Sequence, residues 1–255
     1  MTQAANQREA ILRGMLAGDA EILRHWHNQT GVALSLGDAE GEWLLLADAE
    51  SGQPLACLRL VKGLGLSLPR FSYHVGRVVH ASAELDLFRT QTTLLLGNDH
   101  SGESELADLA CAPSLGAEAQ VDCLSRLIQA ALQRIQAQPE CFAERLIVEL
   151  AGRRDEQNQL PFWQGLGAHF YAGDPAAAQL KFGDAWRSHL AALLPRQTLY
   201  LSFLSEAAQL SLAQVGTAGT AAAEALANNG FGFSQHVRID DGGPVWERLT
   251  GKASS

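Results

Sequence analysis

The densest group of potentially reactive side chains is the string Asn98-Asp-His-Ser-Gly102, which places an amide, a carboxylate, an imidazole and a hydroxyl within five residues. Asp99 could hold a cationic substrate through its charge, with Asn98 as a polar neighbour. The same residue types also favour tight turns, because Asn, Asp, Ser and Gly accept turn dihedrals and bond to nearby backbone. Substrate contact and turn both stay open as interpretations.

Three further carboxylates could meet a basic ligand. Glu84 and Glu105 could each pair with a guanidinium, whose planar fork matches a carboxylate. Glu149 follows apolar residues of a β-type run, which would place its carboxylate at the end of a sheet strand. The alternative for Glu84 and Glu105 is an ordinary solvated surface charge.

Metal and nucleophile motifs with usable spacing are missing from the sequence. His25 and His27 are two residues apart on a predicted helix and therefore point to different faces, so we expect no metal site. The acidic pair Asp240-Asp241 precedes two glycines and a proline, which is typical of a turn leaving a strand. No phosphate loop of the GxxxxGK type is present.

The elements that must position these side chains alternate between helical and β-type patterns, which predicts an α/β or α+β domain with a mixed central sheet and flanking helices. We expect a single domain over residues 1–255. Helices are predicted at 18–29, 118–136, 161–167, 185–194 and 218–229. Strands are predicted at 43–47, 54–61, 72–82, 92–96, 104–112, 145–150 and 199–204, and a last one at 233–239.

The composition is that of a globular protein, with 47% hydrophobic and 18% charged residues. The net charge of −9 argues against nucleic acid and against anionic membranes, and it mildly favours basic small molecules. We see no secretory signal and no apolar run long enough to span a bilayer. Cys57, Cys111, Cys123 and Cys141 are scattered, so we expect buried reduced thiols and a cytoplasmic protein.

Several longer strings resemble one known family. They are Pro69-Arg-Phe-Ser-Tyr-His-Val-Gly76, Val79-His-Ala-Ser-Ala-Glu-Leu85, Thr93-Leu-Leu-Leu-Gly-Asn-Asp-His-Ser-Gly-Glu-Ser-Glu-Leu106, Pro161-Phe-Trp-Gln-Gly-Leu-Gly-Ala-His-Phe170 and Ile239-Asp-Asp-Gly-Gly-Pro244. Together they resemble the arginine N-succinyltransferases over about two-thirds of the chain. The match is looser over residues 1–68, and the family's segment beyond the Gly-Gly-Pro motif has no counterpart here.

The resemblance implies a fold related to the GNAT acyltransferases, which hold acyl-CoA between two splayed strands and pass the acyl group directly to an amine. It also implies that Leu109 and Ala110 contact the acyl donor, with backbone N–H groups near Leu109 facing the thioester carbonyl. Gly116 would then form the turn before the helix whose N-terminus receives the pyrophosphate.

Two positions depart from the family pattern. Glu118 and Val121 stand where the family has glycines at the pyrophosphate turn, and Glu118 adds a negative charge that instead suits a helix N-terminus. Gly216 stands where the family has its proton-donating histidine. A substitute acid or base would have to come from His100, His236 or Glu149, although each histidine could equally be a packing or surface residue.

Two hypotheses follow from this combination. The chain could transfer a succinyl or related acyl group from CoA to the α-amine of arginine, in arginine catabolism, with Glu84, Asn98, Asp99 and Glu105 binding the amino acid. It could instead be a pseudoenzyme that binds a ligand or regulates a partner subunit. We expect no tightly bound cofactor, an acyl-CoA such as succinyl-CoA as co-substrate, and homo- or hetero-oligomers with a family paralogue.

Overall fold

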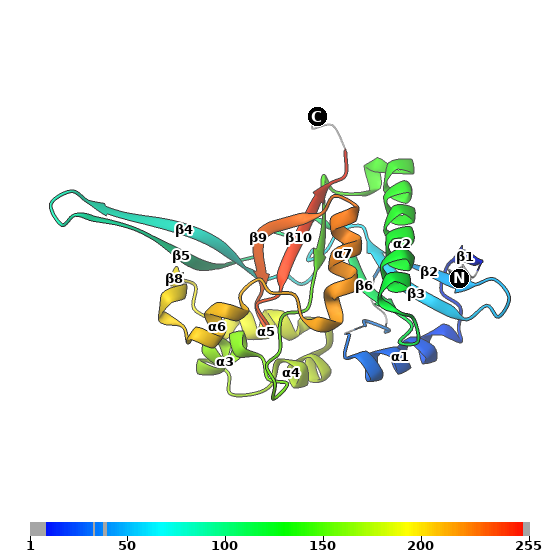
Figure 1. Cartoon of the computed structure of the whole chain (residues 1–255), viewed down its shortest axis with the longest axis horizontal. Helices are drawn as coiled ribbons and strands as arrows, with labels where there is room; N and C mark the ends of the chain where they lie inside the picture. Colours follow the sequence, from blue (N-terminus) through cyan, green and yellow to red (C-terminus); the bar gives the residue numbers. More distant parts are fainter. Residues whose placement is uncertain (1–8, 33, 38–39, 252–255) are drawn as a thin grey trace, which may run out of the picture.

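The computed structural model describes residues 9–32, 34–37 and 40–251, which form one sheet with helices on both of its faces (Figure 1). The strands follow the spatial order β1-β2-β3-β6-β7-β10-β9-β4-β5-β8. Their bounds are β1 Ala10–Arg13, β2 Glu42–Asp48, β3 Pro54–Val61, β4 Ser72–Ser82, β5 Leu87–Gly97, β6 Ser104–Cys111, β7 Arg145–Glu149, β8 Leu199–Tyr200, β9 Gly232–Arg238 and β10 Pro244–Leu249. The α-helices are α1 Asp19–Thr30, α2 Ala117–Ala137, α3 Pro161–Gly165, α4 Pro175–Phe182, α5 Trp186–Leu193, α6 Glu206–Ser211 and α7 Thr220–Asn228.

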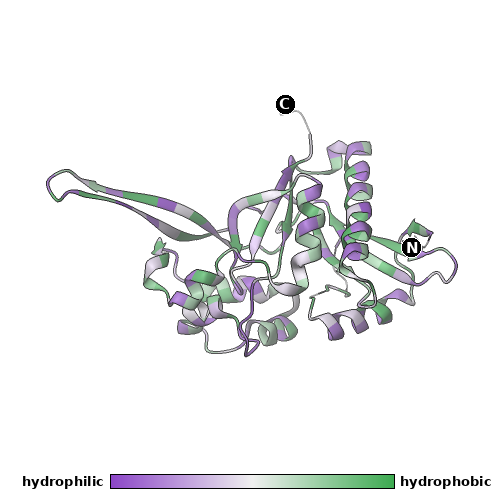
Figure 2. Cartoon of the chain, in the orientation of Figure 1, coloured by the Kyte–Doolittle hydropathy of each residue, from purple (hydrophilic) through white to green (hydrophobic). Residues whose placement is uncertain are grey.

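Side-chain alternation along the strands sends apolar residues to both faces of the sheet. In β2, Leu44 and Leu46 pack into a core beneath α2 and α7, whereas Leu45 packs with α1 on the opposite face. The helices α2 and α7 lie side by side across the first face (Figure 1). The amphipathic character of α2 is visible in the alternation of apolar and polar residues along it (Figure 2).

A separate core fills the other end of the sheet. Tyr73, Leu94 and Val237 project from β4, β5 and β9 and pack against the helices that follow β7. Phe162 of α3 is fully buried there and meets Tyr73 edge to face, with ring centroids 6.1 Å apart. The helical segment after β7 therefore buries the face of β4, β5 and β9 that the first core does not reach.

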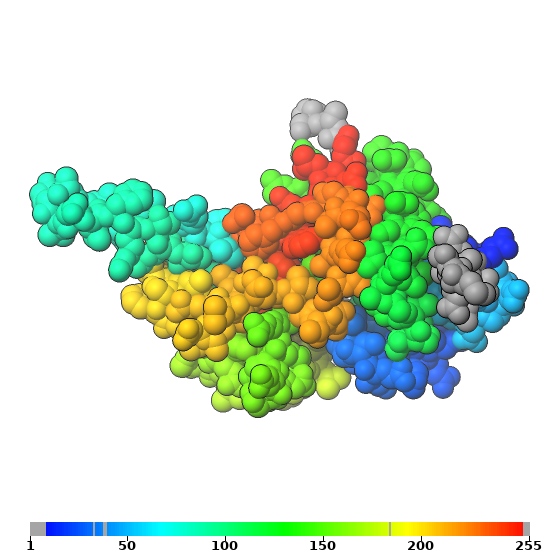
Figure 3. Space-filling view, viewed as in Figure 1, coloured from blue at the N-terminus to red at the C-terminus, as the bar shows by residue number. Residues whose placement is uncertain are grey.

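The sheet is mixed, as predicted, because every ladder is antiparallel except the parallel contact between β6 and β7. Strands β4 and β5 form a long ribbon whose outer half extends away from the body (Figures 1 and 3). No helix in the described part of the chain is long and apolar enough to cross a membrane.

Most predicted elements are confirmed, but two predictions at the end of the chain are wrong. The strand predicted at 199–204 is only two residues long, because β8 pairs with β5 at Thr93 and Leu94 and then tightens into a 3-10 turn at Leu201–Phe203. The strand predicted as the last one is β9, and the chain turns back as β10. The prediction missed β10 because it took the residues after Asp240-Asp241-Gly-Gly for an exit from the sheet, whereas they are the loop of a β-hairpin.

Candidate active site

The parallel strands β6 and β7 separate soon after they meet. They pair only through Ser104 with Leu146 and Glu105 with Ile147, and within the described residues no later position of β6 is paired with β7. Such a divergence leaves backbone groups of β6 without a sheet partner on that side, next to the end of β7. The splayed strand pair that the resemblance implies is therefore present.

A β-bulge lies in β6 on the edge that faces β3. Cys57 pairs with Ala110 but Arg59 pairs with Ala107, so Leu58 alone opposes the two residues Asp108 and Leu109. Asp108 accordingly adopts a left-handed conformation with φ of 55°. A bulge leaves one residue outside the regular ladder and re-aims the strand, and here it does so at Leu109.

The carboxylate of Asp108 holds this bulge from both sides. It accepts a hydrogen bond from Nε of Arg59 at 2.5 Å and another from the backbone N–H of Ser35 at 2.8 Å. Arg59 is itself buried and donates a second hydrogen bond to the carbonyl of Glu40. The loop after α1 is thus fixed to the bulge directly through Asp108 and also through the buried Arg59.

The turn that leads into α2 is open toward solvent. Gly116 is the N-cap residue of α2 with an extended backbone, and a Cβ placed there would meet nothing within 4 Å. Glu118 lies in the first helical turn, where a carboxylate interacts favourably with the helix dipole. The geometry therefore suits the helix-capping interpretation of Glu118. The first backbone N–H groups of α2 remain exposed and have no side-chain cap.

Glu149, at the end of β7, is the centre of a buried charge network. Arg187 binds it through two hydrogen bonds of 2.7 and 2.5 Å, and Nε of Arg70 donates a third at 2.8 Å. Arg238 lies 3.7 Å from the same carboxylate, and Arg70 also reaches Glu105 at 2.8 Å. Two carboxylates from β6 and β7 are therefore bridged by one guanidinium at the point where the strands separate.

Burial and charge act in opposite directions on these two carboxyl groups. Burial alone would raise the pKa of Glu149, but the charges of Arg187, Arg70 and Arg238 outweigh it and hold that pKa well below its usual range. Glu105 is desolvated to a similar extent with less compensation from Arg70, so its pKa is raised. Glu149 is thus a fixed anion and cannot accept a proton near neutral pH.

A second polar group gathers where β5 ends, against β9. Nε2 of His236 lies 3.0 Å from a carboxylate oxygen of Asp99, and Nδ1 lies 2.9 Å from the carbonyl of Ser234. Both partners are acceptors, and the tautomer of His236 decides which of the two receives its ring N–H. The ring of His100 packs 4.3 Å from that of His236, and that of His74 lies 5.1 Å away.

His100 differs from its neighbours because it is buried and its Nε2 has no hydrogen-bond partner. Desolvation, followed by the neighbouring His236, lowers the pKa of His100 to about 4. The imidazole is therefore neutral at pH 7 and carries a free ring nitrogen at the edge of the charge network.

Three loops converge on the backbone just after β7. The N–H of Gly216 donates to the carbonyl of Ala151 at 2.8 Å, and Val215 forms an isolated bridge with Gly152. The carboxylate of Asp241 in turn accepts from the N–H of Gly152 at 2.9 Å. A Cβ on Gly216 would lie 2.5 Å from the carbonyl oxygen of Gly152, so the loop is closed around a residue without a side chain.

Comparison with known proteins identifies the family. The model described as the arginine N-succinyltransferase beta subunit matches residues 16–254. The arginine N-succinyltransferase of Salmonella typhi is 32% identical over 97% of this chain, and the chain spans 72% of its length. The chain belongs to the arginine N-succinyltransferase family.

Other members of the family extend this comparison. The arginine N-succinyltransferase of Salmonella arizonae is 34% identical over 82% of this chain, which spans 60% of that relative. The solved structure of the arginine/ornithine succinyltransferase subunit AI from Pseudomonas aeruginosa is similar in fold, with a TM-score of 0.72 and 23% identity over 95% of this chain and 77% of that one.

The site residues that the family resemblance suggested fall into separate places. Leu109 and Ala110 lie at the bulge of β6, and Gly116 lies at the start of α2. Asp99 and His100 meet His236, while Glu105 meets Glu149 through Arg70. Asn98 is exposed in the turn after β5.

Glu84 lies apart from the other residues that were predicted to bind the amino acid substrate. It lies at the tip of the β4–β5 ribbon, exposed, where it accepts a hydrogen bond from the hydroxyl of Ser82 at 3.0 Å. Asn98 and Asp99 follow the end of β5 that lies away from this tip, and Glu105 lies in β6.

The residues that sequence reasoning missed are mostly arginines. Arg59, Arg70, Arg187 and Arg238 organise both the bulge and the charge network. Arg70 lay inside a family string, directly after Pro69, and Arg238 directly precedes the string that begins at Ile239. No group of three or more His, Cys, Asp or Glu residues in the described regions could hold a metal ion.

Proposed function

We propose that the chain transfers the succinyl group of succinyl-CoA to the α-amine of arginine. The observation that carries this proposal is the divergence of β6 and β7 beside the bulge at Asp108 and Leu109, in a chain of this family. The gap between two separating strands receives the extended arm of the acyl donor. The bulge turns a backbone N–H toward the thioester carbonyl, where it stabilises the negative charge that develops on oxygen.

The chemical step needs few side chains. The amine lone pair of arginine attacks the thioester carbonyl carbon, the oxygen becomes negatively charged, and the carbon–sulfur bond breaks as the amide forms. The amine loses a proton and the CoA thiolate gains one, so the two transfers balance. Proximity of the two reactants supplies much of the acceleration in such a direct transfer.

We assign the proton transfer to His100. Among the three candidates, Glu149 is held as an anion by three arginines and both nitrogens of His236 face acceptors. His100 alone keeps a ring nitrogen without a partner, and it is neutral at pH 7. Gly216, at the position of the family histidine, offers no group for this task.

Recognition of the acceptor rests on Asp99. Its side chain is 58% exposed and uses one carboxylate oxygen for His236, which leaves the other for a guanidinium. Asn98 lies beside it in the same turn. Glu105 is already bound to Arg70 and is a positioning residue in this scheme. Because both proposed substrates are intracellular metabolites, we further propose that the protein works in the cytoplasm.

The decisive experiment measures thiol release from succinyl-CoA with and without arginine, using the full chain. Arginine-dependent release is expected, and His100→Gln is expected to reduce kcat by about 10²- to 10⁴-fold. The control is His25→Gln, an exposed histidine of α1. Arginine-independent or absent release by the folded protein contradicts the proposal.

A second function, ligand binding without catalysis, is favoured by one observation. The loop at Gly216 is packed so closely on Gly152 that no side chain fits there. Calorimetry with succinyl-CoA and with free CoA separates the two functions, since the acidic first turn of α2 favours weak binding. Micromolar binding together with turnover excludes the non-catalytic function, and saturable binding without turnover supports it.

A further inference from the structure

Arg70 is the arginine of the charge network that solvent reaches most easily. Its side chain is 27% exposed, against 9% for Arg187 and 17% for Arg238. Its Nε donates to Glu149 and its Nη2 to Glu105, which leaves Nη1 without a hydrogen-bond partner among the described residues. A guanidinium carries five N–H donors in a planar fork, so Arg70 can bind one more anion without releasing either glutamate.

The guanidinium of Arg70 lies where β6 and β7 begin to separate. Glu105 is the last residue of β6 that pairs with β7, opposite Ile147, and Glu149 lies two residues further along β7. These three residues share one face of the sheet, because side chains two apart on a strand point the same way. Ile147 packs there with Val61, on the face opposite the core beneath α2. Arg70 therefore closes the narrow end of the gap on the side away from α2.

The spacing between Arg70 and the bulge suits a short acyl chain. Leu109 is four residues beyond Glu105 on β6, and Glu149 stands level with a position two residues beyond it. Strands advance about 3.3 Å per residue, so the guanidinium that joins the two glutamates ends roughly 7 Å short of Leu109. An extended four-carbon acyl group with a carboxylate at its far end spans about 4 Å, and a charge-assisted hydrogen bond adds about 3 Å. An acyl carbonyl held beside Leu109 thus brings such a carboxylate within reach of Arg70.

The charges around Arg70 allow a further anion to bind. Glu149 is matched by the two hydrogen bonds of Arg187, so it does not depend on Arg70 alone. Burial raises the pKa of Glu105, and a second anion on Arg70 would raise that pKa further. Glu105 can therefore take up a proton as the anion binds, and no buried charge is left unpaired.

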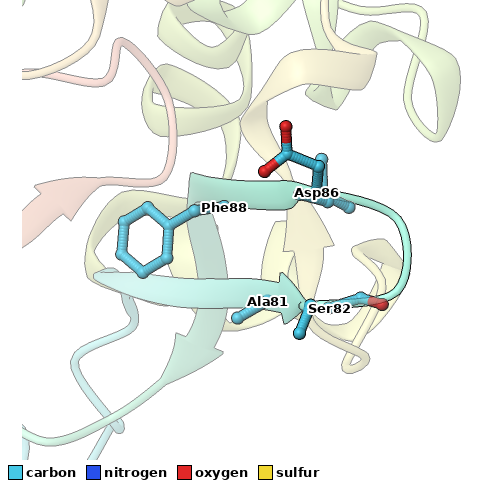
Figure 4. A pocket seen from close by; sticks show the side chains of 6 residues that line it. Ala81, Ser82, Asp86 and Phe88 are labelled. Atoms are coloured by element: carbon cyan, nitrogen blue, oxygen red, sulfur yellow. The ribbon is translucent and has the colours of Figure 1, made fainter.

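The hollow at the tip of the β4–β5 ribbon offers no such cation. Its volume is about 340 Å³, and Asp86 is the charged residue in its lining (Figure 4). The lining consists of Ala81, Ser82, Ala83, Asp86, Leu87 and Phe88. A carboxylate ligand would meet a second carboxylate in that hollow, whereas at Arg70 it meets free N–H donors.

We propose that Arg70 selects the acyl donor by binding the carboxylate at the far end of the succinyl group. Its free N–H groups donate to this carboxylate while Glu149 and Glu105 hold the guanidinium in place. An acyl group of the same length that ends in a methyl leaves those donors without an acceptor and is the poorer ligand. This inference rests on the proposed transfer of a succinyl group and adds the residue that distinguishes donors with a distal carboxylate from those without one.

Calorimetry with the full chain compares succinyl-CoA with butyryl-CoA, which has four acyl carbons and no distal carboxylate. The wild type is expected to bind succinyl-CoA about ten- to hundredfold more tightly, as hydrogen bonds between charged groups do. Arg70→Met is expected to remove this preference and to leave the affinity for butyryl-CoA within about twofold. Arg70→Lys keeps the charge without the planar fork and is expected to retain part of the preference.

Arg187→Lys is the matched control, because Arg187 binds the same Glu149 but is only 9% exposed. It is expected to leave the ratio of the two affinities unchanged. Circular dichroism and urea denaturation check that each variant is folded. Equal binding of both donors by the wild type, an equal loss of both in Arg70→Met, or binding of neither donor by the folded wild type would each overturn the role of Arg70.

Thiol release tests the proposed function separately. A preference for succinyl-CoA in binding without any arginine-dependent turnover contradicts the transfer reaction and leaves the role of Arg70 standing. Turnover that does not distinguish the two donors contradicts the role of Arg70 and leaves the transfer reaction standing.

Discussion

Gly216 occupies a position where a side chain is excluded by the surrounding backbone. Gly216→Ala would place a Cβ 2.5 Å from the carbonyl oxygen of Gly152, which is closer than atoms can approach. The loop must shift and weaken the hydrogen bond to Ala151, so we expect a loss of about 1–3 kcal/mol in the free energy of unfolding.

Urea denaturation measures this loss, and Gly232→Ala serves as the control because a Cβ at Gly232 meets no atom within 4 Å. Equal stability of the two variants would contradict the packing of this loop.

Glu149 is the side chain whose loss should cost the most stability. Glu149→Gln leaves the buried guanidinium of Arg187 and its neighbours without their shared anion, and breaking one partner of a buried ion pair costs about 3–5 kcal/mol. Chemical denaturation measures the change.

The control for this variant is Glu42→Gln. Glu42 pairs with Arg134 at 2.8 Å, but their side chains are 47% and 54% exposed. An exposed pair contributes about 0–1 kcal/mol. If both variants lost the same stability, Glu149 would not be the centre of the network.

At the scale of the element, the bulge in β6 depends on a residue that accepts a left-handed backbone. Asn also accepts a left-handed backbone, so Asp108→Asn loses only the charged contact with Arg59. Ala disfavours that backbone and has no side-chain acceptor, so Asp108→Ala loses both the backbone tolerance and the contact with Arg59. We therefore expect Ala to destabilise the fold by about 1 kcal/mol more than Asn.

Thermal unfolding tests the order of these two variants, and thiol-release kinetics tests the consequence for the bulge. In the proposed mechanism the backbone N–H beside Leu109 acts on the developing oxyanion, so kcat should fall more than KM rises. An effect confined to KM is the outcome that argues against the role of the bulge.

Most elements could be predicted because their patterns are local. The apolar spacing of Leu124, Leu127 and Ile128 predicts α2, and the left-handed Gly230 marks the end of α7 as expected. The pairing of β10 with β7 could not be predicted, because it joins segments about a hundred residues apart.

Site residues could be predicted only where they lie in or near a sequence string that resembles the family. Asp99 and His100 were found from their turn-like sequence, and His236 from its place near a family string. The arginines that surround Glu149 come from β9, α5 and the segment before β4, and no local spacing links them. Their meeting is a property of the sheet order, which sequence patterns do not specify.

At the scale of the whole molecule, the charge network makes stability depend on pH. The folded-state pKa of Glu149 lies well below the unfolded value of about 4.3. A carboxyl group whose pKa is depressed by folding contributes stability that is fully present above the unfolded pKa and is lost as the pH falls through the folded one. The contribution of Glu149 is therefore complete at neutral pH and declines in acid.

Comparing wild type with Glu149→Gln at two pH values measures this contribution together with the change in Glu105, whose pKa the charge of Glu149 helps to raise. Burial raises the pKa of Glu105, so that group acts in the opposite sense and remains in both proteins. We expect the penalty of Glu149→Gln, measured by urea denaturation, to be largest at pH 7 and clearly smaller near pH 3. A penalty that stays constant across this range would show that the three arginines do not set the ionisation of Glu149, and that the network holds the ends of β6 and β7 by packing alone.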